Sequence, residues 1–561
     1  MWKLLEAKNL SVKFRKSNFV LRPLAFEINN GETVAIIGES GSGKTTLLKA
    51  LSCLSDDDAI VSGEVKFKGI ELVGMKELVL RKYRFSSFSM VFQNSNEYLN
   101  PRLTLKESLF EILIKKFDRA EIMKKALELM REVGLDESVL DNYPHDLSGG
   151  MIQKFQIACA VSLTPELIYL DEPTSSLDAA SRNEFVSLIK KIKKNYGTAF
   201  ICVTHDMALA AELADRTIVM YQGIICEEAE TAALIRMPRH PYSRALLNCA
   251  VELNLYKDAW GIRDDNSGGQ ESGCPFAGRC TQSIPDCFCY IPELTESAGG
   301  GKLSCIRGGI VNVLECEKIK KSYGGKTVLT GCNLELYSGE IVSIVGRSGS
   351  GKTTLCNILA GFLAQDSGSV TFCGRKADYD SIYRRMNGLQ FLMQDHGDSL
   401  DPHLSVYNAI NEPLYLFVDK SDHHVEVKAV LEAVGLEHTD TFLQRKIHTL
   451  SGGQRQRVGL ARCLITQPSV LIADEPTSML DSSSKANLNR LLKARQNTSG
   501  FSMLVVTHDL PSALKISDRI YLLRDGVLKE LERALPPEKI AELMYNVAAH
   551  LVNNEPERSC L

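Results

Sequence analysis

Short apolar runs of strand length recur along the chain, and each is followed by a polar or a helix-forming segment. The runs TVAIIG and IVSIVG precede the helix-like segments TTLLKALSCL and TTLCNILAGF. The runs ELIYLDE and SVLIADE end in carboxylates, and AFICVTHD and MLVVTHD end in histidine and aspartate. Continuous apolar runs bounded by polar residues are typical of buried parallel strands, so the pattern predicts an α/β fold.

Two longer segments show the periodicity of amphipathic helices. Ile122, Ala126, Leu129 and Val133 follow one another at steps of four, three and four, and Val427, Leu431 and Val434 repeat the trend. This spacing places the apolar side chains on one helix face. We interpret these residues mainly as core, rather than as a partner-binding stripe.

The chain contains an internal duplication. GESGSGKTTLL returns as GRSGSGKTTLC, LSGG occurs twice, LDEPTSSLD returns as ADEPTSMLD, and VTHD occurs twice. The offset is 308 positions at the lysine (44 to 352) and 303 at the serine, glutamate and histidine that follow (148 to 451, 172 to 475, 205 to 508). A length of 561 residues also favours at least two domains, so two copies of one domain are fused.

A glycine-rich G-x-x-x-x-G-K-T motif lies between the first strand and helix of each copy. Its glycines let backbone amides converge on a phosphate, the lysine adds a positive charge, and the threonine hydroxyl suits Mg²⁺. A plain glycine turn before a helix is the alternative, but two copies with matching downstream motifs disfavour it. The predicted triphosphate-binding residues are Gly38, Ser40, Gly41, Ser42, Gly43, Lys44, Thr45, Thr46, Gly346, Ser348, Gly349, Ser350, Gly351, Lys352, Thr353 and Thr354.

Polar residues at the carboxyl ends of the next strands complete a predicted hydrolytic site. Asp171 and Asp474 are expected to hold the Mg²⁺ shell, and the adjacent Glu172 and Glu475 to polarise the attacking water. His205 and His508 follow a third strand, where an imidazole can contact the γ-phosphate. A lone histidine after a strand is usually an ordinary loop residue, but this order of motifs favours the functional interpretation.

Together these residues resemble the ATP-binding cassette ATPases, whose hallmark LSGG lies upstream of the DEP strand in both halves. The resemblance covers residues 1 to about 235 and about 312 to 535. It implies an α/β fold class of two tandem P-loop NTPase domains, each with a RecA-like core and a helical subdomain. The predicted domains are 1–235, an extension and linker at 236–311, 312–535, and a tail at 536–561.

The resemblance also implies roles for further residues. Gln93 and Gln394 are expected to bind Mg²⁺ and link the γ-phosphate to the helical subdomain, and Ser175–Asp178 and Ser478–Asp481 to form loops that cross between halves. Phe14 and Tyr323 occupy the place of the aromatic that stacks on adenine, with core packing as the alternative. The signature residues are Ser148, Gly149, Gly150, Ser451, Gly452 and Gly453.

In such ATPases the signature does not touch the nucleotide of its own half, so a head-to-tail sandwich is implied. Lys44 would share one ATP with the signature at Ser451, and Lys352 the other with the signature at Ser148. The motif residues are present in both halves, so we expect two competent sites. The first signature departs from the second, with Met151 and Lys154 in place of Gln454 and Arg457, which puts equal turnover in doubt.

Four cysteines, Cys274, Cys280, Cys287 and Cys305, follow the run HPYSRALLNC, with Cys289 as a bystander thiol nearby. This combination resembles the C-terminal extension of ATPase subunits in dipeptide, oligopeptide and nickel importers, where C-P-F-x-x-R-C follows HPY. A flexible linker is expected at 264–273. Members of this subfamily carry a four-iron four-sulfur (4Fe-4S) cluster in the extension; zinc, or no metal, remain alternatives.

The composition limits the classes of partner that the chain is expected to bind. The 65 Lys and Arg against 69 Asp and Glu give a formal charge of −4, so there is no basic field for nucleic acid. Neither a targeting signal nor an apolar run of about 18 residues occurs, so we expect a cytosolic chain. Sixteen cysteines in that compartment are more typical of buried thiols or metal ligands than of disulfides.

The resemblance therefore implies an ATPase that energises an importer of di- or oligopeptides or a related solute, using ATP and Mg²⁺. Its partners would be two integral-membrane permease subunits and, indirectly, an extracytoplasmic solute-binding protein, which places it peripherally at the cytoplasmic face of the membrane. A nickel or metal-chelate importer is the first alternative. A soluble tandem protein acting on ribosomes is a distant one, because a long charged linker and basic patches are missing from the sequence.

Overall fold

The computed structural model describes most of the chain: residues 3–16, 20–93, 99–175, 177–254, 257–258, 260–264, 272–297, 299–394, 400–416, 423–477 and 480–531. The chain divides into two compact units. The first unit comprises Met1–Ala250, Glu271–Phe276 and Cys289–Gly309, and the second comprises Val251–Gln270, Ala277–Phe288 and Ile310–Leu561. Residues of the predicted extension are thus shared between both units, while most of the predicted linker and the whole of the tail lie outside the described residues.

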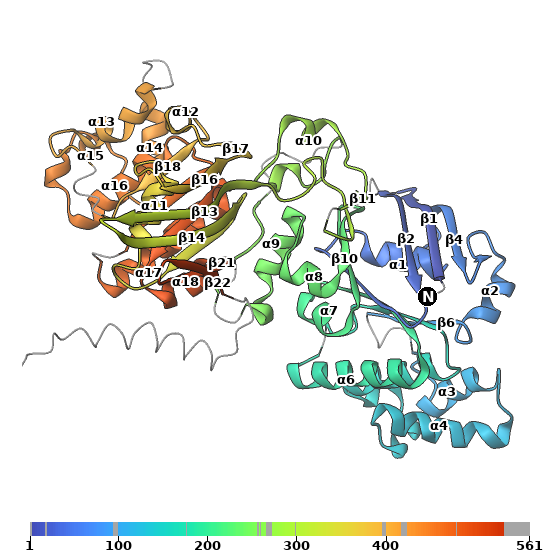
Figure 1. The fold of residues 1–561 in the computed structure, drawn as a ribbon. Coiled ribbons are helices and arrows are strands. Elements are labelled where there is room, and N and C mark those ends of the chain that lie inside the picture. The colour runs from blue at the N-terminus through green and yellow to red at the C-terminus, as the bar shows by residue number, and fades with distance from the viewer. Residues whose placement is uncertain are drawn as a thin grey trace, which may run out of the picture. The chain divides into compact units, whose positions relative to one another are not determined.

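The first unit contains two sheets (Figure 1). The antiparallel sheet has the order β2-β1-β4-β5, and the core sheet the order β11-β12-β10-β9-β3-β8-β7-β6. Their strands are β1 (Lys3–Phe14), β2 (Val20–Asn29), β3 (Thr33–Ile37), β4 (Ala59–Phe67), β5 (Ile70–Glu71), β6 (Phe88–Val91), β7 (Leu167–Asp171), β8 (Ala199–Thr204), β9 (Arg216–Tyr221), β10 (Ile224–Glu230), β11 (Thr295–Glu296) and β12 (Lys302–Leu303). Strands β6, β7, β8, β3 and β9 run parallel, which is the arrangement that the apolar runs predict.

The second unit repeats this plan. Its antiparallel sheet has the order β14-β13-β16-β17, and its core sheet the order β18-β19-β20-β15-β21-β22. The strands are β13 (Asn312–Tyr323), β14 (Lys326–Tyr337), β15 (Ile341–Val345), β16 (Ser367–Phe372), β17 (Arg375–Lys376), β18 (Leu389–Leu392), β19 (Val470–Asp474), β20 (Ser502–Thr507), β21 (Arg519–Arg524) and β22 (Val527–Glu530). Every residue of β15, β19 and β20 is buried, as in β3, β7 and β8.

Helices follow the core strands in both units. In the first unit they are α1 (Lys44–Leu51), α2 (Glu77–Tyr83), α3 (Leu105–Leu113), α4 (Arg119–Val133), α5 (Gly149–Val161), α6 (Ala179–Tyr196), α7 (Met207–Leu213), α8 (Thr231–Arg236) and α9 (Pro241–Cys249). Helix α10 (Pro285–Cys289) lies in the extension. The second unit has α11 (Lys352–Leu359), α12 (Tyr379–Tyr383), α13 (Val406–Asn411), α14 (His424–Ala433), α15 (Asp440–Leu443), α16 (Gly452–Leu464), α17 (Ser482–Ser499) and α18 (Leu510–Ile516).

The two amphipathic segments form helices whose apolar faces are buried, so their interpretation as core is confirmed. Ile122, Ala126, Leu129 and Val133 of α4 pack in one apolar cluster with residues of α3 and α5. Val427 and Leu431 of α14, with Val434 just after it, pack in the equivalent cluster of the second unit. In Figure 1, α3 and α4 lie together at the end of the first unit opposite β1, β2 and β4.

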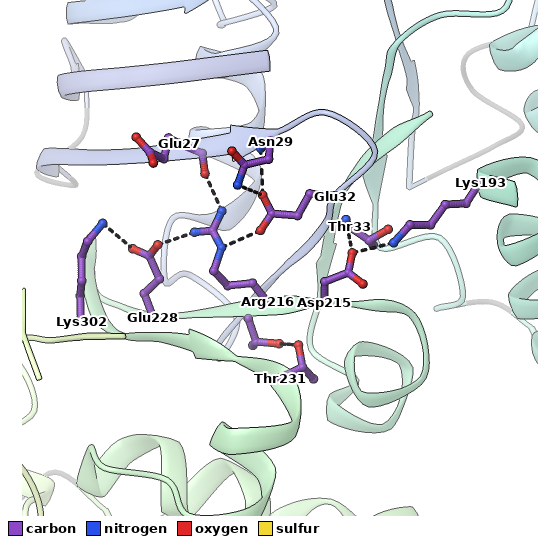
Figure 2. Close-up of polar contacts among 11 residues, drawn as sticks. Glu27, Asn29, Glu32, Thr33, Lys193, Asp215, Arg216, Glu228, Thr231 and Lys302 are labelled. Atoms are coloured by element: carbon purple, nitrogen blue, oxygen red, sulfur yellow. Dashed lines mark hydrogen bonds and ion pairs between the residues drawn. The ribbon is translucent and has the colours of Figure 1, made fainter. Parts of the chain in front are cut away.

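A partly buried arginine joins the two sheets of the first unit (Figure 2). The Arg216 guanidinium, at the start of β9, donates to a Glu32 carboxylate oxygen at 2.7 Å, to Glu228 of β10, and to the Glu27 carbonyl of β2 at 2.5 Å. Lys302 of β12 lies 3.6 Å from the other Glu228 oxygen. One partly buried cation therefore ties the antiparallel sheet to the core sheet, and Glu228 extends the network to the extension.

No helix in the described ranges combines the length and the apolarity that crossing a bilayer requires.

Candidate functional site

The first glycine-rich loop connects β3 to α1. Lys44, the first residue of α1, is buried, and its ammonium donates to the carbonyls of Gly38 and Glu39 at 2.9 Å each. Burial lowers the pKa of Lys44 from its usual value, while nearby carboxylates, Glu172 first, oppose that effect. Gly43, which precedes the helix, has a φ of 98°, in the region that favours glycine. The loop thus folds around a lysine that is available to a phosphate.

The second loop has the same geometry. The Lys352 ammonium donates to the carbonyls of Gly346 at 2.9 Å and Arg347 at 2.8 Å, and Gly351 has a φ of 99°. In both loops a buried serine hydroxyl, Ser42 or Ser350, has no hydrogen-bond partner among the described residues. The other predicted phosphate-binding residues lie in the same two loops and helix starts: Ser40, Gly41, Thr45, Thr46, Ser348, Gly349, Thr353 and Thr354.

The predicted Mg²⁺ residues meet at the helix start. The Thr45 hydroxyl donates to the Asp171 carboxylate at 3.0 Å, and burial raises the pKa of Asp171 while this bond lowers it. Asp474 is buried likewise, and its Oδ1 atom has no hydrogen-bond partner among the described residues. The first unit thus places a threonine hydroxyl beside the carboxylate, and the second leaves a buried carboxylate oxygen unused. Both features fit a Mg²⁺ ion, which prefers oxygen ligands.

Each predicted water-polarising glutamate follows its strand in a left-handed backbone conformation. Glu172 has a φ of 43° and Glu475 a φ of 45°. Their backbone amides donate to Val203 and Val506 at 2.8 Å, which holds the turn against the neighbouring strand. Such a conformation costs a non-glycine residue about 1 kcal/mol or more and is often found at functional sites.

The partners of the two glutamates differ. The Glu172 carboxylate accepts from the Gln93 side-chain amide at 2.9 Å and lies 3.4 Å from His205 Nδ1. The Glu475 carboxylate lies 3.2 Å from His508 Nδ1 and 4.0 Å from the Lys352 ammonium.

Gln394, the predicted counterpart of Gln93, is exposed. The structure therefore brings lysine, glutamate and histidine together in both units, and adds the glutamine to this set in the first.

The signature residues form exposed helix starts. Ser148 caps α5 by accepting from the Met151 amide at 3.4 Å, and Gly149 and Gly150 open the helix. Ser451 caps α16 and completes a capping box, because its own amide donates to the Gln454 side chain at 3.1 Å. Gly452 and Gly453 are exposed. The first cassette has Met151 at the position of Gln454, and a methionine side chain cannot make the reciprocal bond of this box.

The predicted crossing loops begin just after the glutamates. Asp178 caps α6 by accepting from the Ser181 amide at 2.7 Å, and Asp481 caps α17. Ser478 lies outside the described residues.

The two predicted adenine-stacking aromatics differ. Phe14 is partly buried and packs against the apolar core beneath the antiparallel sheet. Tyr323 is 48% exposed, with the Lys321 ammonium 5.7 Å from its ring centre. Core packing, the alternative to adenine stacking, therefore fits the position of Phe14 but not that of Tyr323.

The predicted thiol ligands do not form a recognisable metal site. Within the ranges that the structure describes, no group of three or more His, Cys, Asp or Glu side chains is arranged to hold a metal ion. Cys274 and Cys305 belong to the first unit, and Cys280 and Cys287 to the second. The arrangement of the described residues thus adds no support of its own to a cluster or to zinc.

A further thiol, Cys226, which the sequence pattern did not single out, lies in the first unit. Cys226 is an extra residue in β10, because the pairing with β9 shifts between Ile225 and Glu227, whereas β21 and β22 pair without a shift. Burial raises the pKa of Cys226 well above its usual value, and Cys274 and Cys305 add to this. No signal in the sequence marks this extra residue, because the two hairpins of the repeat align at the same offset of 303 on both sides of it (Gly223 with Gly526, Glu227 with Glu530).

The sequence matches the family described as ABC transporter at residues 21–175 and 329–478. The chain belongs to the ATP-binding cassette (ABC) transporter family. Both cassettes carry the phosphate loop and the carboxylates described above, and the protein is an ABC-type ATPase. Residues 226–287 also match the family described as Oligopeptide/dipeptide transporter, C-terminal region.

Two curated relatives align with nearly the whole chain. The oligopeptide transport ATP-binding protein OppD of Mycobacterium tuberculosis is 32% identical over 94% of this chain and 94% of its own length. The glutathione import ATP-binding protein GsiA of Escherichia coli is 32% identical over 94% of this chain and 86% of its own length.

Proposed function

We propose that this ABC ATPase powers the import of di- or oligopeptides, or of a related solute such as glutathione, through two separate membrane permeases. The match of residues 226–287 to the oligopeptide and dipeptide transporter extension carries the proposal. Two phosphate loops with matching lysine geometry support two working ATP sites. The relatives named for oligopeptide transport and glutathione import support the class of solute.

At each site, Lys44 or Lys352 turns from the loop carbonyls to the phosphates of ATP. Thr45 with Asp171, and Thr353 with Asp474, would hold Mg²⁺, which when bound would neutralise charge on the phosphates. Glu172 and Glu475 polarise the attacking water, and His205 and His508 contact the γ-phosphate. The proximity of each glutamate to its histidine supports this division of roles, because the two side chains can share one water.

Each ATP is shared between the cassettes in this proposal. The signature residues Ser148 to Gly150 and Ser451 to Gly453 begin helices, whose N-termini favour anions, and most of them are exposed. Lys44 and the signature at Ser451 grip one ATP, and Lys352 and the signature at Ser148 grip the other. Nucleotide drives closure only if it binds the closed state more tightly, and hydrolysis removes that difference.

The number of cysteines in the extension, and the match of the extension to the oligopeptide/dipeptide transporter C-terminal region, support a 4Fe-4S cluster. If Cys274, Cys280, Cys287 and Cys305 hold it, protein purified without oxygen will be brown and contain about four iron atoms per chain. Colourless, iron-free protein from the same preparation would remove the cluster, and zinc in its place would favour the structural-metal alternative.

Reconstitution with permease subunits and a solute-binding protein of the oligopeptide-importer class tests the import function. We expect a small peptide or glutathione to stimulate ATP hydrolysis and to accumulate inside vesicles. Stimulation by a nickel chelate alone would establish the metal importer instead. Recovery of ribosomes rather than permeases from a pull-down would contradict an import function altogether.

A further inference from the structure

A tyrosine of the extension touches the phosphate loop of the first cassette. The backbone amide of Glu39, the second residue of that loop, donates to the Tyr242 hydroxyl at 2.8 Å. The two residues lie 203 positions apart, and Tyr242 is fully buried. The tyrosine of the HPY run is therefore directly bonded to the loop that folds around Lys44.

The backbone of Tyr242 is held rigidly. Tyr242 is in the first turn of α9, where its amide donates to His240 Nδ1 at 3.1 Å. The amides of Arg239 and His240 both donate to the buried Glu227 carboxylate of β10, at 2.9 Å each. These bonds fix the start of α9 to the core sheet, so the hydroxyl is presented at a set position.

The ring of Tyr242 packs against two other aromatic rings, which also contact each other. The ring centres of Tyr242 and Tyr221, the last residue of β9, are 4.7 Å apart. Phe276 lies 5.2 Å from Tyr242 and 5.3 Å from Tyr221. Phe276 comes two residues after Cys274, so the cysteine-bearing segment of the extension packs on the ring whose hydroxyl reaches the loop.

A second bond holds the far side of the same loop. The amide of Gly223, in the turn between β9 and β10, donates to the Ser42 carbonyl at 3.0 Å. A side chain at Gly38 would stand 2.2 Å from the Met220 carbonyl, so the loop also lies directly against the end of β9. The loop is thus anchored on both sides before nucleotide arrives, and such preorganisation raises affinity by reducing the ordering cost of binding.

The second cassette differs at this point. Arg347 occupies the position of Glu39, and no HPY run follows the second cassette in the sequence. An anchor of this kind therefore distinguishes the first ATP site from the second.

We propose that Tyr242 is a positioning residue that preorganises the phosphate loop of the first cassette, so that the extension sets the ATP affinity of that site. Phe276 transmits the state of the extension to Tyr242. This inference rests on the proposed role of residues 38–45 in binding phosphate.

Equilibrium binding of a non-hydrolysable ATP analogue to the full chain tests the inference. Lys352→Ala weakens the second site, so that binding reports mainly on the first. Lys44→Ala weakens the first site, so that binding reports mainly on the second. In the Lys352→Ala background, Tyr242→Phe is expected to weaken binding about three- to ten-fold, the effect of one lost hydrogen bond. In the Lys44→Ala background the same change is expected to leave affinity unaltered.

Tyr169→Phe is the matched control, because Tyr169 is also fully buried and its hydroxyl donates to the Leu51 carbonyl at 3.1 Å, away from the loop. It should leave binding at both sites unchanged, whereas Phe276→Leu should weaken the first site in the same direction as Tyr242→Phe. Unchanged affinity in Tyr242→Phe, or equal weakening in both backgrounds, would overturn the inference. Loss of all binding by the Lys352→Ala parent would instead contradict the proposed role of the first loop.

Discussion

Lys257 forms a buried ion pair with Asp518. Lys257 precedes the second cassette in the chain but belongs to the second unit, as Asp518 does. In the first unit the equivalent aspartate, Asp215, is paired with Lys193 of α6 at 2.6 Å. The residue 303 positions after Lys193 is Gln496, which cannot make this pair. The segment after the first cassette therefore supplies a cation that the second cassette lacks.

Lys257→Ala is expected to destabilise the second unit by about 3 kcal/mol, because it leaves the Asp518 carboxylate buried without its cation. Side-chain exposure is only 8% for Lys257 and 1% for Asp518. Calorimetric melting of the full chain measures the loss. Adding Gln496→Lys should recover part of it by recreating the arrangement of the first unit.

Lys193→Ala is the matched control for this pair. Lys193 and Asp215 are 29% and 55% exposed, so their ion pair is expected to contribute less than about 1 kcal/mol. Equal effects of the two substitutions would show that burial of Lys257 is not what matters.

The double substitution Glu172→Gln and Glu475→Gln should remove ATP hydrolysis while leaving ATP-dependent closure intact. Loss of a general base costs about 100- to 10,000-fold in rate, and glutamine keeps the size of the side chain. Steady-state phosphate release measures turnover, and Glu166→Gln, a surface glutamate paired with Lys68, is the control. Near-normal hydrolysis in the double variant would show that these glutamates do not polarise the water.

His240 makes the first unit sensitive to acid. Burial lowers its pKa from 6.5 to about 4. Between these values the unfolded chain takes up a proton and the folded chain does not, so stability is full above about pH 6.5 and falls as the pH drops toward 4. The loss reaches about 3 kcal/mol.

His240→Asn keeps an acceptor for the Tyr242 amide but cannot titrate. Its melting temperature should therefore decline less between pH 6.5 and 4 than that of the unaltered chain. Parallel declines would assign the acid sensitivity to other groups.

Local sequence pattern was sufficient for much of the fold. Buried strands such as TVAII and LIYLD are apolar at almost every position, and each phosphate loop is encoded within a few residues of its strand and helix. The same locality made Lys44, Asp171 and Glu172 predictable as neighbours, because parallel strands end at one edge of a sheet.

Contacts between distant segments were not predictable in this way. Nothing near Glu39 indicates that its amide meets Tyr242, and nothing near Lys257 indicates Asp518, since both contacts depend on where the extension packs. The extra residue Cys226 breaks the period of two in β10 without changing its composition. The iron–sulfur hypothesis came from four cysteines and from the resemblance to the importer subfamily, and the arrangement of the described residues adds no support to it.

The central claim is that both cassettes bind each ATP together. The most direct test combines two substitutions in the full chain. In the Glu172→Gln and Glu475→Gln background, Lys44→Ala with Ser451→Arg damages a single shared site, whereas Lys44→Ala with Ser148→Arg damages both. Counting the ATP retained per chain after rapid gel filtration should give about one in the first case and none in the second. The reverse result, with ATP retained only when Lys44 and Ser148 are both altered, would mean that each cassette binds ATP with its own signature.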